Sequence, residues 1–254
     1  MAGIYLHVPF CRQACHYCDF HFSTKTQNTE SMVQAIVHEA QLRWAHNPAW
    51  RAEHFRTLYL GGGTPSLLSP ALAKTLISGV AKACRIRLSD LEEVTLEANP
   101  EDLSQDHLEA WKEAGVTRLS VGIQSFHDET LDWMNRAHTG KQAEEGILRA
   151  HRAGFDSMTV DLIYGVPTER LWDDDLKRAL DLPVQHLSAY ALTVEPRTVL
   201  GTRVSRGDEP EPSDSRAADE YHRLCALLAQ RGWLHYETSN WAAPSGNGAF
   251  ATAR

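Results

Sequence analysis

The chain has 254 residues, of which 43% are hydrophobic and 23% charged, as expected for a soluble globular protein that buries one large core. Its formal net charge of −8 argues against a general surface for nucleic acid or anionic membranes. The sequence begins without a signal-peptide pattern, and no apolar run approaches about 18 residues. We therefore expect no transmembrane segment and a cytoplasmic location, where closely spaced cysteines more often bind metal than form disulfides.

Short β-rich runs alternate with helical patterns along the chain. The runs are near-continuous apolar segments, as expected for parallel strands covered on both faces. The predicted strands are residues 3–8, 57–60, 93–98, 118–123, 158–163 and 186–192. The predicted helices are residues 30–46, 69–84, 104–114, 128–134, 141–153 and 171–182. Ser104 is a candidate cap for the third helix, and Gly115 follows its end. Six βα units with short connections predict right-handed crossovers and a parallel sheet.

The C-terminal part departs from this pattern. Residues 206–215 are polar and predict a loop, and residues 215–231 have helical spacing and are followed by Gly232. Residues 242–254 show no periodicity, and we expect them to be disordered or incomplete. The predicted organisation is a core over residues 1–205, followed over 206–254 by a polar loop, a helix and the start of a truncated C-terminal domain.

Three cysteines, Cys11, Cys15 and Cys18, lie within eight residues directly after the first predicted strand. Thiolates at this spacing can hold three corners of a four-iron cluster and leave one iron open for a small molecule. A structural zinc site is the alternative, but it would need a fourth ligand. Three histidines lie near enough in sequence to supply one: His7, His16 and His21. The cysteines alone leave both interpretations open.

The segment from Tyr5 to Cys18, Tyr-x-His-x-Pro-Phe-Cys-x(3)-Cys-x-Tyr-Cys, resembles the signature of radical S-adenosylmethionine proteins. Within them it is similar to the group around oxygen-independent coproporphyrinogen III dehydrogenase and the HemW-type heme chaperone. The resemblance covers roughly residues 4–242. It implies an α/β fold, a partial (βα)6 barrel with parallel strands, and a 4Fe-4S cluster and S-adenosylmethionine as cofactors. The three cysteines match the cluster ligands.

Five further motifs each follow a predicted strand or the helix after it, on the side where ligands bind in parallel α/β folds. Each has a plainer interpretation, such as a tight turn for the glycines or a solvated side chain for a lone acid or arginine. Zinc binding explains none of them. By the resemblance, eight residues match positions that bind S-adenosylmethionine: Tyr5, Gly62, Gly63, Thr64, Glu97, Gln124, Arg136 and Asp161.

Two functions fit this resemblance. One is a heme chaperone that binds heme and transfers it to acceptor proteins, and the other is the dehydrogenase, which decarboxylates propionate side chains in porphyrin biosynthesis. The dehydrogenase pattern continues with a fourth cysteine where this chain has Phe20, and that enzyme usually has a longer N-terminal region. Both differences favour the chaperone, coproporphyrinogen III oxidase-like but without that activity. The expected partners are heme or porphyrin and a reductant such as flavodoxin or ferredoxin, and no nucleic acid.

The end of the chain departs from the family. Family members continue beyond residues 236–242 into a C-terminal domain with a His-Asn-x-x-x-Tyr-Trp-like motif linked to heme handling. This chain reads Ala-Pro-Ser-Gly-Asn-Gly over residues 243–248 and stops at Arg254. The comparison predicts a fragment, a frame-shifted product or a shortened variant. Any heme would need another axial ligand, and none of the 13 histidines stands out for that role.

Overall fold

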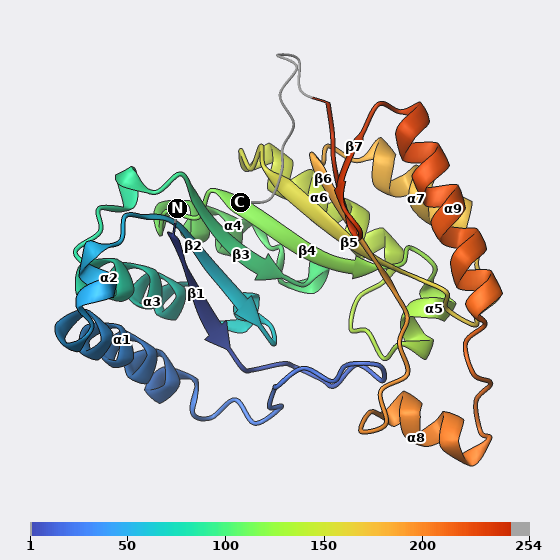
Figure 1. Ribbon diagram of the computed structural model, residues 1–254, viewed down its shortest axis with the longest axis horizontal. Helices are drawn as coiled ribbons and strands as arrows, with labels where there is room; N and C mark the ends of the chain where they lie inside the picture. The colour runs from blue at the N-terminus through green and yellow to red at the C-terminus, as the bar shows by residue number, and fades with distance from the viewer. Residues whose placement is uncertain (1, 245–254) are drawn as a thin grey trace.

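Six parallel strands dominate the computed structural model, which describes residues 2–244 (Figure 1). They pair in chain order: β1 (Ala2–Val8), β2 (Phe55–Gly62), β3 (Glu93–Ala98), β4 (Arg118–Gln124), β5 (Met158–Tyr164) and β6 (His186–Ala191). Two short strands, β8 (Asn240–Ala242) and β7 (Leu234–Glu237), extend the sheet antiparallel beyond β6. The sheet is open, with β1 and β7 at its edges. The predicted partial α/β barrel of six parallel strands is therefore confirmed.

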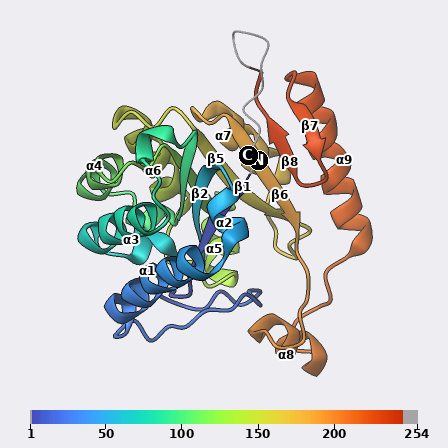
Figure 2. The same ribbon diagram turned by 60° about the vertical axis from the view of Figure 1, so that its left-hand side comes forward.

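Helices cover the outer face of the sheet. The helices α1 (Thr29–His46), α3 (Pro70–Ala83), α4 (Gln105–Glu113) and α6 (Gly140–Arg152) contact one another in that order around it (Figure 2). The remaining helices of the six predicted units are α5 (Asp128–Trp133) and α7 (Trp172–Asp181). Ser104 caps α4 as predicted, because its side chain accepts a hydrogen bond from the His107 N–H. No helix among residues 2–244 has the length and apolar character needed to cross a membrane.

Two α-helices and two β-strands were missed from the sequence. They are α2 (Pro48–Ala52), α8 (Val199–Arg206), β7 and β8, each too short to show a period of its own. The helix α9 (Asp214–Gln230) begins within the predicted polar loop, which shrinks to residues 207–213. The expectation of no structure from residue 242 onward is wrong at Ala242, which is buried in β8, and residues 245–254 lie outside the described residues.

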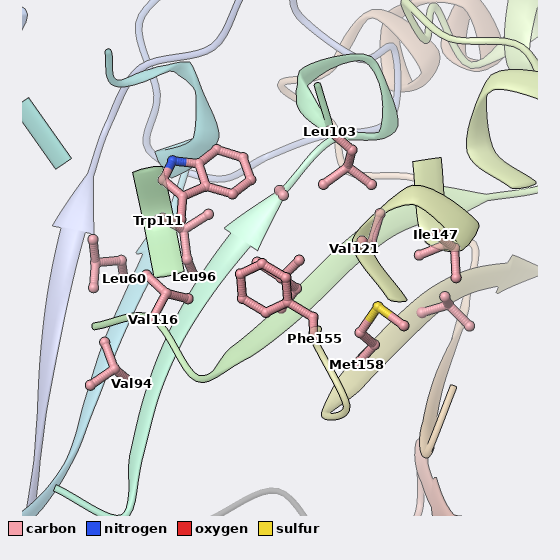
Figure 3. Packing of buried hydrophobic residues seen from close by; sticks show 14 of the residues in the cluster. Leu60, Val94, Leu96, Leu103, Trp111, Val116, Val121, Ile147, Phe155 and Met158 are labelled. Atoms are coloured by element: carbon pink, nitrogen blue, oxygen red, sulfur yellow. The ribbon is translucent and has the colours of Figure 1, made fainter. Parts of the chain in front are cut away.

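The hydrophobic core lies between the sheet and the helices. Figure 3 shows Leu96 and Val121 from the strands packed among Trp111, Ile147 and Phe155 from the helical side. Side chains that alternate with these along each strand point to the other face. There the sheet presents polar residues, among them Glu97, Ser120 and Asp161. The strands are thus apolar on one face only, which differs from the expectation of strands apolar on both faces.

The last helix and hairpin share this core. Leu224 and Leu228 of α9 and Trp241 of β8 are buried in the same hydrophobic cluster as β1–β6. The proposed division at residue 205/206 falls at the end of α8. We keep that division as a proposal, because continuity of the core does not by itself define independently folding units.

Replacing Leu96 with alanine tests the core. Leu96 is 0% exposed, so the substitution removes buried methyl groups and leaves a cavity; we expect a loss of about 2–5 kcal/mol in the free energy of unfolding. Urea denaturation followed by circular dichroism measures it. Leu42→Ala, on a residue 46% exposed on α1, is the control and should change stability by less than about 0.5 kcal/mol. Equal losses in both variants would contradict the assigned core.

Candidate functional site

A cavity of about 820 Å³ opens where the parallel strands end. Ten of the eleven predicted site residues line it: Cys11, Cys15, Cys18, Gly62, Gly63, Thr64, Glu97, Gln124, Arg136 and Asp161. The eleventh, Tyr5, is 57% exposed on β1 and stacks on Tyr59 with ring centroids 5.8 Å apart. It lies outside the cavity lining. The carboxyl ends of parallel strands meet at one edge, and this brings together residues that are far apart in sequence.

The loop that carries the cysteines is ordered by its own backbone. The Cys11 N–H donates to the Ser23 carbonyl at 3.0 Å, and the Ser23 N–H donates to the Pro9 carbonyl at 2.7 Å. Thr64 donates its hydroxyl proton to the Cys11 sulfur at 3.4 Å. Burial raises the pKa of the Cys11 thiol, and the Thr64 hydrogen bond lowers it in part. All three cysteine sulfurs are free of disulfides, as expected for ligands.

The segment after α5 clamps the same loop. The Gln13 amide donates to the Asn135 carbonyl at 2.8 Å, and the Asn135 amide donates back to the Ala14 carbonyl at 2.7 Å. The His16 N–H donates to the Met134 carbonyl at 3.1 Å. Asn135 has a left-handed φ of 58°, which asparagine tolerates better than most residues. Asn135 was not among the predicted site residues, and no local pattern marks this clamp.

A second support for the loop comes from α8. The Leu200 N–H donates to the His16 carbonyl at 2.8 Å, and Arg197, which precedes α8, pairs with Asp19 at 3.1 Å. Both views show α8 beside the loop that follows β1 (Figures 1 and 2). The cysteine loop is thus held from two sides by segments that sequence reasoning did not connect with it.

Arg136 places a positive charge between the cysteine loop and the sheet. Its guanidinium donates to the Cys15 sulfur at 3.3 Å and to the Asn99 side-chain oxygen and the Gly122 carbonyl at 2.7 Å each. Its buried Nε has no hydrogen-bond partner within the described part of the chain. Burial alone would lower the pKa of Arg136, but nearby Tyr17 and Cys15 raise it above its usual value. The cation is therefore permanent. Asn99 was not predicted.

The glycine turn after β2 approaches the cysteine loop closely. Gly62 has a φ of 119°, which favours glycine, and its N–H donates to a Glu97 carboxylate oxygen at 3.1 Å. A Cβ added to Gly63 would lie 2.7 Å from the Phe10 carbonyl oxygen and 3.0 Å from the Cys11 sulfur. Any side chain at Gly63 would push the two segments apart. The glycines here do more than form a turn.

Two of the acids that line the cavity come from the sheet. Glu97 accepts the Tyr59 hydroxyl at 2.8 Å; burial raises the pKa of Glu97, and the hydrogen bonds from Tyr59 and Gly62 lower it in part. Burial and the charge of Glu97 raise the pKa of Asp161 to about 7, although Ser188 and Arg118 act in the opposite direction. Asp161 therefore titrates near neutral pH, as a carboxyl group does in a site that excludes water.

The end of β4 is distorted at Gln124. Its φ is 70°, and the register between β4 and β5 shifts between Gly122 and Gln124. An irregularity of this kind bends a strand end and redirects a side chain, and is common beside functional sites. Gln124 is one of the predicted site residues, and it lines the cavity.

The residues of the cavity fit a cluster and a small molecule that carries both a carboxylate and positive groups. Among residues 2–244, no group of three or more His, Cys, Asp or Glu side chains is placed to hold one metal ion. A cubane separates its ligands onto different corners, so three cysteines around one cavity suit a cluster better than a single zinc ion. The unpaired Nε of Arg136 leaves a donor beside the cysteines, and the cavity of about 820 Å³ leaves room for a bound molecule.

Residues 5–181 match the Radical SAM superfamily, which covers more than half of the chain. The chain therefore belongs to the radical S-adenosylmethionine superfamily. The family assignment made from the cysteine loop and the strand-end motifs is confirmed.

Several curated relatives are heme chaperones. The chain is 39% identical to heme chaperone HemW of Mycobacterium tuberculosis (strain H37Rv) over 96% of its length and 63% of the relative. It is 35% identical to heme chaperone HemW of Escherichia coli (strain K12) over 95% of its length and 63% of the relative. It is also 35% identical to radical S-adenosyl methionine domain-containing protein 1, mitochondrial, of Bos taurus, over 99% of its length and 56% of the relative. The chain thus spans less than two thirds of these relatives.

Solved structures agree with the fold. Coproporphyrinogen III oxidase (HemN) from Escherichia coli, described as a radical SAM enzyme, matches 96% of this chain and 56% of its own with a TM-score of 0.82 and 26% identity. HydG, a maturase of the [FeFe]-hydrogenase, matches 86% of this chain and 47% of its own with a TM-score of 0.56 and 16% identity. The second likeness concerns the fold alone.

Asp161→Asn tests the electrostatics of the cavity. The folded carboxyl, with a pKa of about 7, holds a proton that the unfolded chain releases near pH 4. Stability therefore falls as pH rises between these values and levels off above 7. The variant lacks this term, so the unfolding free energy of wild type minus variant should fall by on the order of 1 kcal/mol per pH unit between pH 5 and 6. Urea unfolding at pH 5, 6, 7 and 8 measures it.

The control for this series is Leu42→Ala, on a side chain that is 46% exposed and carries no ionisable group. Its difference from wild type should stay constant with pH. A constant difference for Asp161→Asn as well would show that this carboxyl is ionised throughout.

Proposed function

We propose that this chain binds a 4Fe-4S cluster through Cys11, Cys15 and Cys18 and S-adenosylmethionine in the adjoining cavity, and that it belongs to a heme chaperone that binds heme and transfers it to acceptor proteins. The observation that carries the cofactor part is the convergence of three cysteines, one buried cation and a glycine turn on one cavity. The similarity to proteins named heme chaperone HemW supports the functional part.

Each cavity residue has a role in this proposal. Arg136, whose guanidinium can form paired hydrogen bonds, would bind the cofactor carboxylate. Gly63 and Thr64 would lie beside the methionine amino group. Gly62 orients Glu97 through the hydrogen bond described above. Tyr5 lies outside the cavity lining and stacks on Tyr59, whose hydroxyl donates to Glu97.

Three further polar side chains complete the proposed cofactor site. Glu97, Gln124 and Asp161 project from three neighbouring strands into the cavity, where hydroxyl and amine groups of a nucleoside can be hydrogen-bonded. The cluster, when bound, supplies the electron for reductive chemistry on S-adenosylmethionine. The chain's own contribution is to orient the cofactor and limit access of water to it.

The rim of the cavity favours porphyrin handling. Phe20 lines the cavity and is 74% exposed, in the place where the dehydrogenase pattern has a fourth cysteine. Phe22, Tyr190 and Leu192 line the same cavity. Apolar and aromatic side chains at an open rim offer contact area to a flat macrocycle.

In this proposal the reductant is a flavodoxin or ferredoxin, and the protein works in the cytoplasm.

The alternative function is oxidative decarboxylation of coproporphyrinogen III. It is favoured by one observation, the likeness to coproporphyrinogen III oxidase over 96% of this chain. That likeness has 26% identity, against 39% for heme chaperone HemW of Mycobacterium tuberculosis. Phe20 in place of a cysteine also speaks for the chaperone, so we rank the enzyme second.

Anaerobic reconstitution with iron and sulfide tests the cluster. Wild type should become brown and hold about four irons per chain, with an EPR signal at low temperature after reduction. Cys15→Ala should lose most of this iron, because a corner ligand is removed. Cys84→Ala, which changes a buried thiol among apolar residues, should keep it. A colourless wild-type protein that takes up zinc, or equal iron in both variants, would refute the cluster.

Heme titration and porphyrin turnover, measured in parallel on the reconstituted protein, separate the two functions. The chaperone proposal predicts stoichiometric heme binding, seen as a shifted Soret band, without a decarboxylated porphyrin product. Phe20→Asp should weaken heme binding by about tenfold, because it places a charge on an apolar contact. Leu171→Asp, at an exposed leucine outside the cavity, is the matched control and should bind heme like wild type. Porphyrin product from wild type would overturn the chaperone proposal.

A further inference from the structure

A buried ion network lies behind the cavity wall. Arg170 ion-pairs with Asp175 at 2.5 Å and with Glu220 at 3.0 Å. The side chains of Arg170 and Asp175 are fully buried, and that of Glu220 is 8% exposed. We call these three residues the Arg170 network. They come from the loop before α7, from α7 and from α9, and none of them is among the residues that line the cavity.

The Asp175 end of the network holds the backbone directly after β4. Its carboxylate accepts the Phe126 N–H at 2.6 Å and the Ser125 hydroxyl at 3.0 Å. These residues follow Gln124, whose left-handed backbone ends the strand in the cavity. A strained conformation persists only where its surroundings hold it. Asp175 supplies such a restraint on the chain immediately after Gln124.

The other end of the network holds the backbone at the end of β5. Arg170 donates to the Ile163 carbonyl at 2.9 Å, and Glu220 accepts the Gly165 N–H at 2.7 Å. Ile163 and Tyr164 line the cavity. Trp172 adds a link to α9, because its indole N–H donates to the Glu220 carbonyl at 2.9 Å. The two adjacent strand ends are thus joined through one guanidinium.

Burial of charges by itself is a poor source of stability. Apolar residues of similar volume often do as well, because desolvation of the charges costs as much as their attraction gains. The Arg170 network is directed at specific backbone groups, and its hydrogen bonds fix positions that an apolar cluster would leave unspecified. The network lies at the ends of β4 and β5, and both ends carry residues that line the cavity. This location indicates that the network positions the cavity wall.

We propose that Arg170, Asp175 and Glu220 are positioning residues that set the β4 and β5 ends of the S-adenosylmethionine cavity, and that α9 thereby takes part in building that cavity. This inference rests on the proposed function for the identity of the ligand. It adds a carboxylate from residue 220, well outside residues 5–181 that match the superfamily, to the construction of the site.

Two variants and a matched control test it. Glu220→Gln removes one charge and keeps the shape. Arg170→Lys keeps the charge, but a single ammonium cannot reproduce the three contacts of the guanidinium fork. Glu92→Gln is the control: it makes the same change in an ion pair with Arg56 at the opposite ends of the strands. Each reconstituted protein is measured for iron content, for the Kd of S-adenosylmethionine by equilibrium dialysis, and for Tm.

We expect Glu220→Gln and Arg170→Lys to raise the Kd by about tenfold or more, since small misplacements of binding groups are costly, with iron content unchanged. The control should stay within about twofold. The positioning role is refuted if the network variants leave the Kd unchanged. It is also refuted if the control loses as much Tm as the network variants and raises the Kd by the same factor, because the network is then only structural.

Hydrogen exchange on the protein without cofactors separates this inference from the proposed function. The amides of Phe126 and Gly165 donate directly to the network carboxylates. Arg170→Lys should speed their exchange by about tenfold or more relative to amides in α3, at a difference of about 1.4 kcal/mol in local opening. A wild type that binds no S-adenosylmethionine would refute the proposed function alone. If Arg170→Lys speeds exchange at these two amides by no more than at the amides of α3, the positioning role of the network is refuted.

Discussion

The parallel pairing of six strands is the constraint on which the site depends. Strands that pair in chain order and run in one direction must end at one edge, and each then turns into a loop or helix at that edge. Tyr59, Glu97, Gln124 and Asp161 therefore come together although 102 residues of chain separate the first from the last. The period of two along a strand supplies the other half of the constraint, because it gives the helices an apolar face and leaves the opposite face for polar residues.

This division explains the electrostatics of the cavity. Arg136 donates to the Cys15 sulfur, and Glu97 and Asp161 line the same cavity from β3 and β5. The buried cation thus contacts the cysteine loop, and two of the lining acids come from the sheet. The raised pKa of Asp161 reflects the cost of placing two carboxylates in one shielded space. A zwitterionic ligand with its carboxylate toward the loop would match this distribution.

Much of the fold was predictable, because each of the six main strands carries a short apolar run and most helices have clear ends. β3 was predicted with its observed bounds, and the cap at Ser104 was correct. Short elements such as α8 and β8 were missed, since too few residues show a period. The polar inner face was also missed. Arg118, Ser120 and Gly122 alternate with apolar residues along β4, but a run counted as apolar overall hides that alternation.

The candidate site divides in the same way. Residues in local motifs, such as Gly63 and Arg136, could be named from sequence because chemistry and spacing coincide there. The residues that hold them in place could not be named from sequence. The contacts of Asn99 with Arg136, of Asn135 with the cysteine loop and of Glu220 with the end of β5 are tertiary, and no local pattern marks them. Tyr5 shows the converse, since a motif residue lies outside the cavity lining.

The anchored cysteine loop has a thermodynamic consequence. Its backbone is tied to Ser23, to the segment after α5 and to Leu200 of α8, so its conformational entropy is lost when the protein folds and not when a cluster arrives. Small zinc-binding domains differ, because they fold only when the metal binds and part of the free energy of metal binding offsets the cost of folding. Here the free energy of metal coordination would remain available for holding the proposed cluster, and the fold around the loop should form without it.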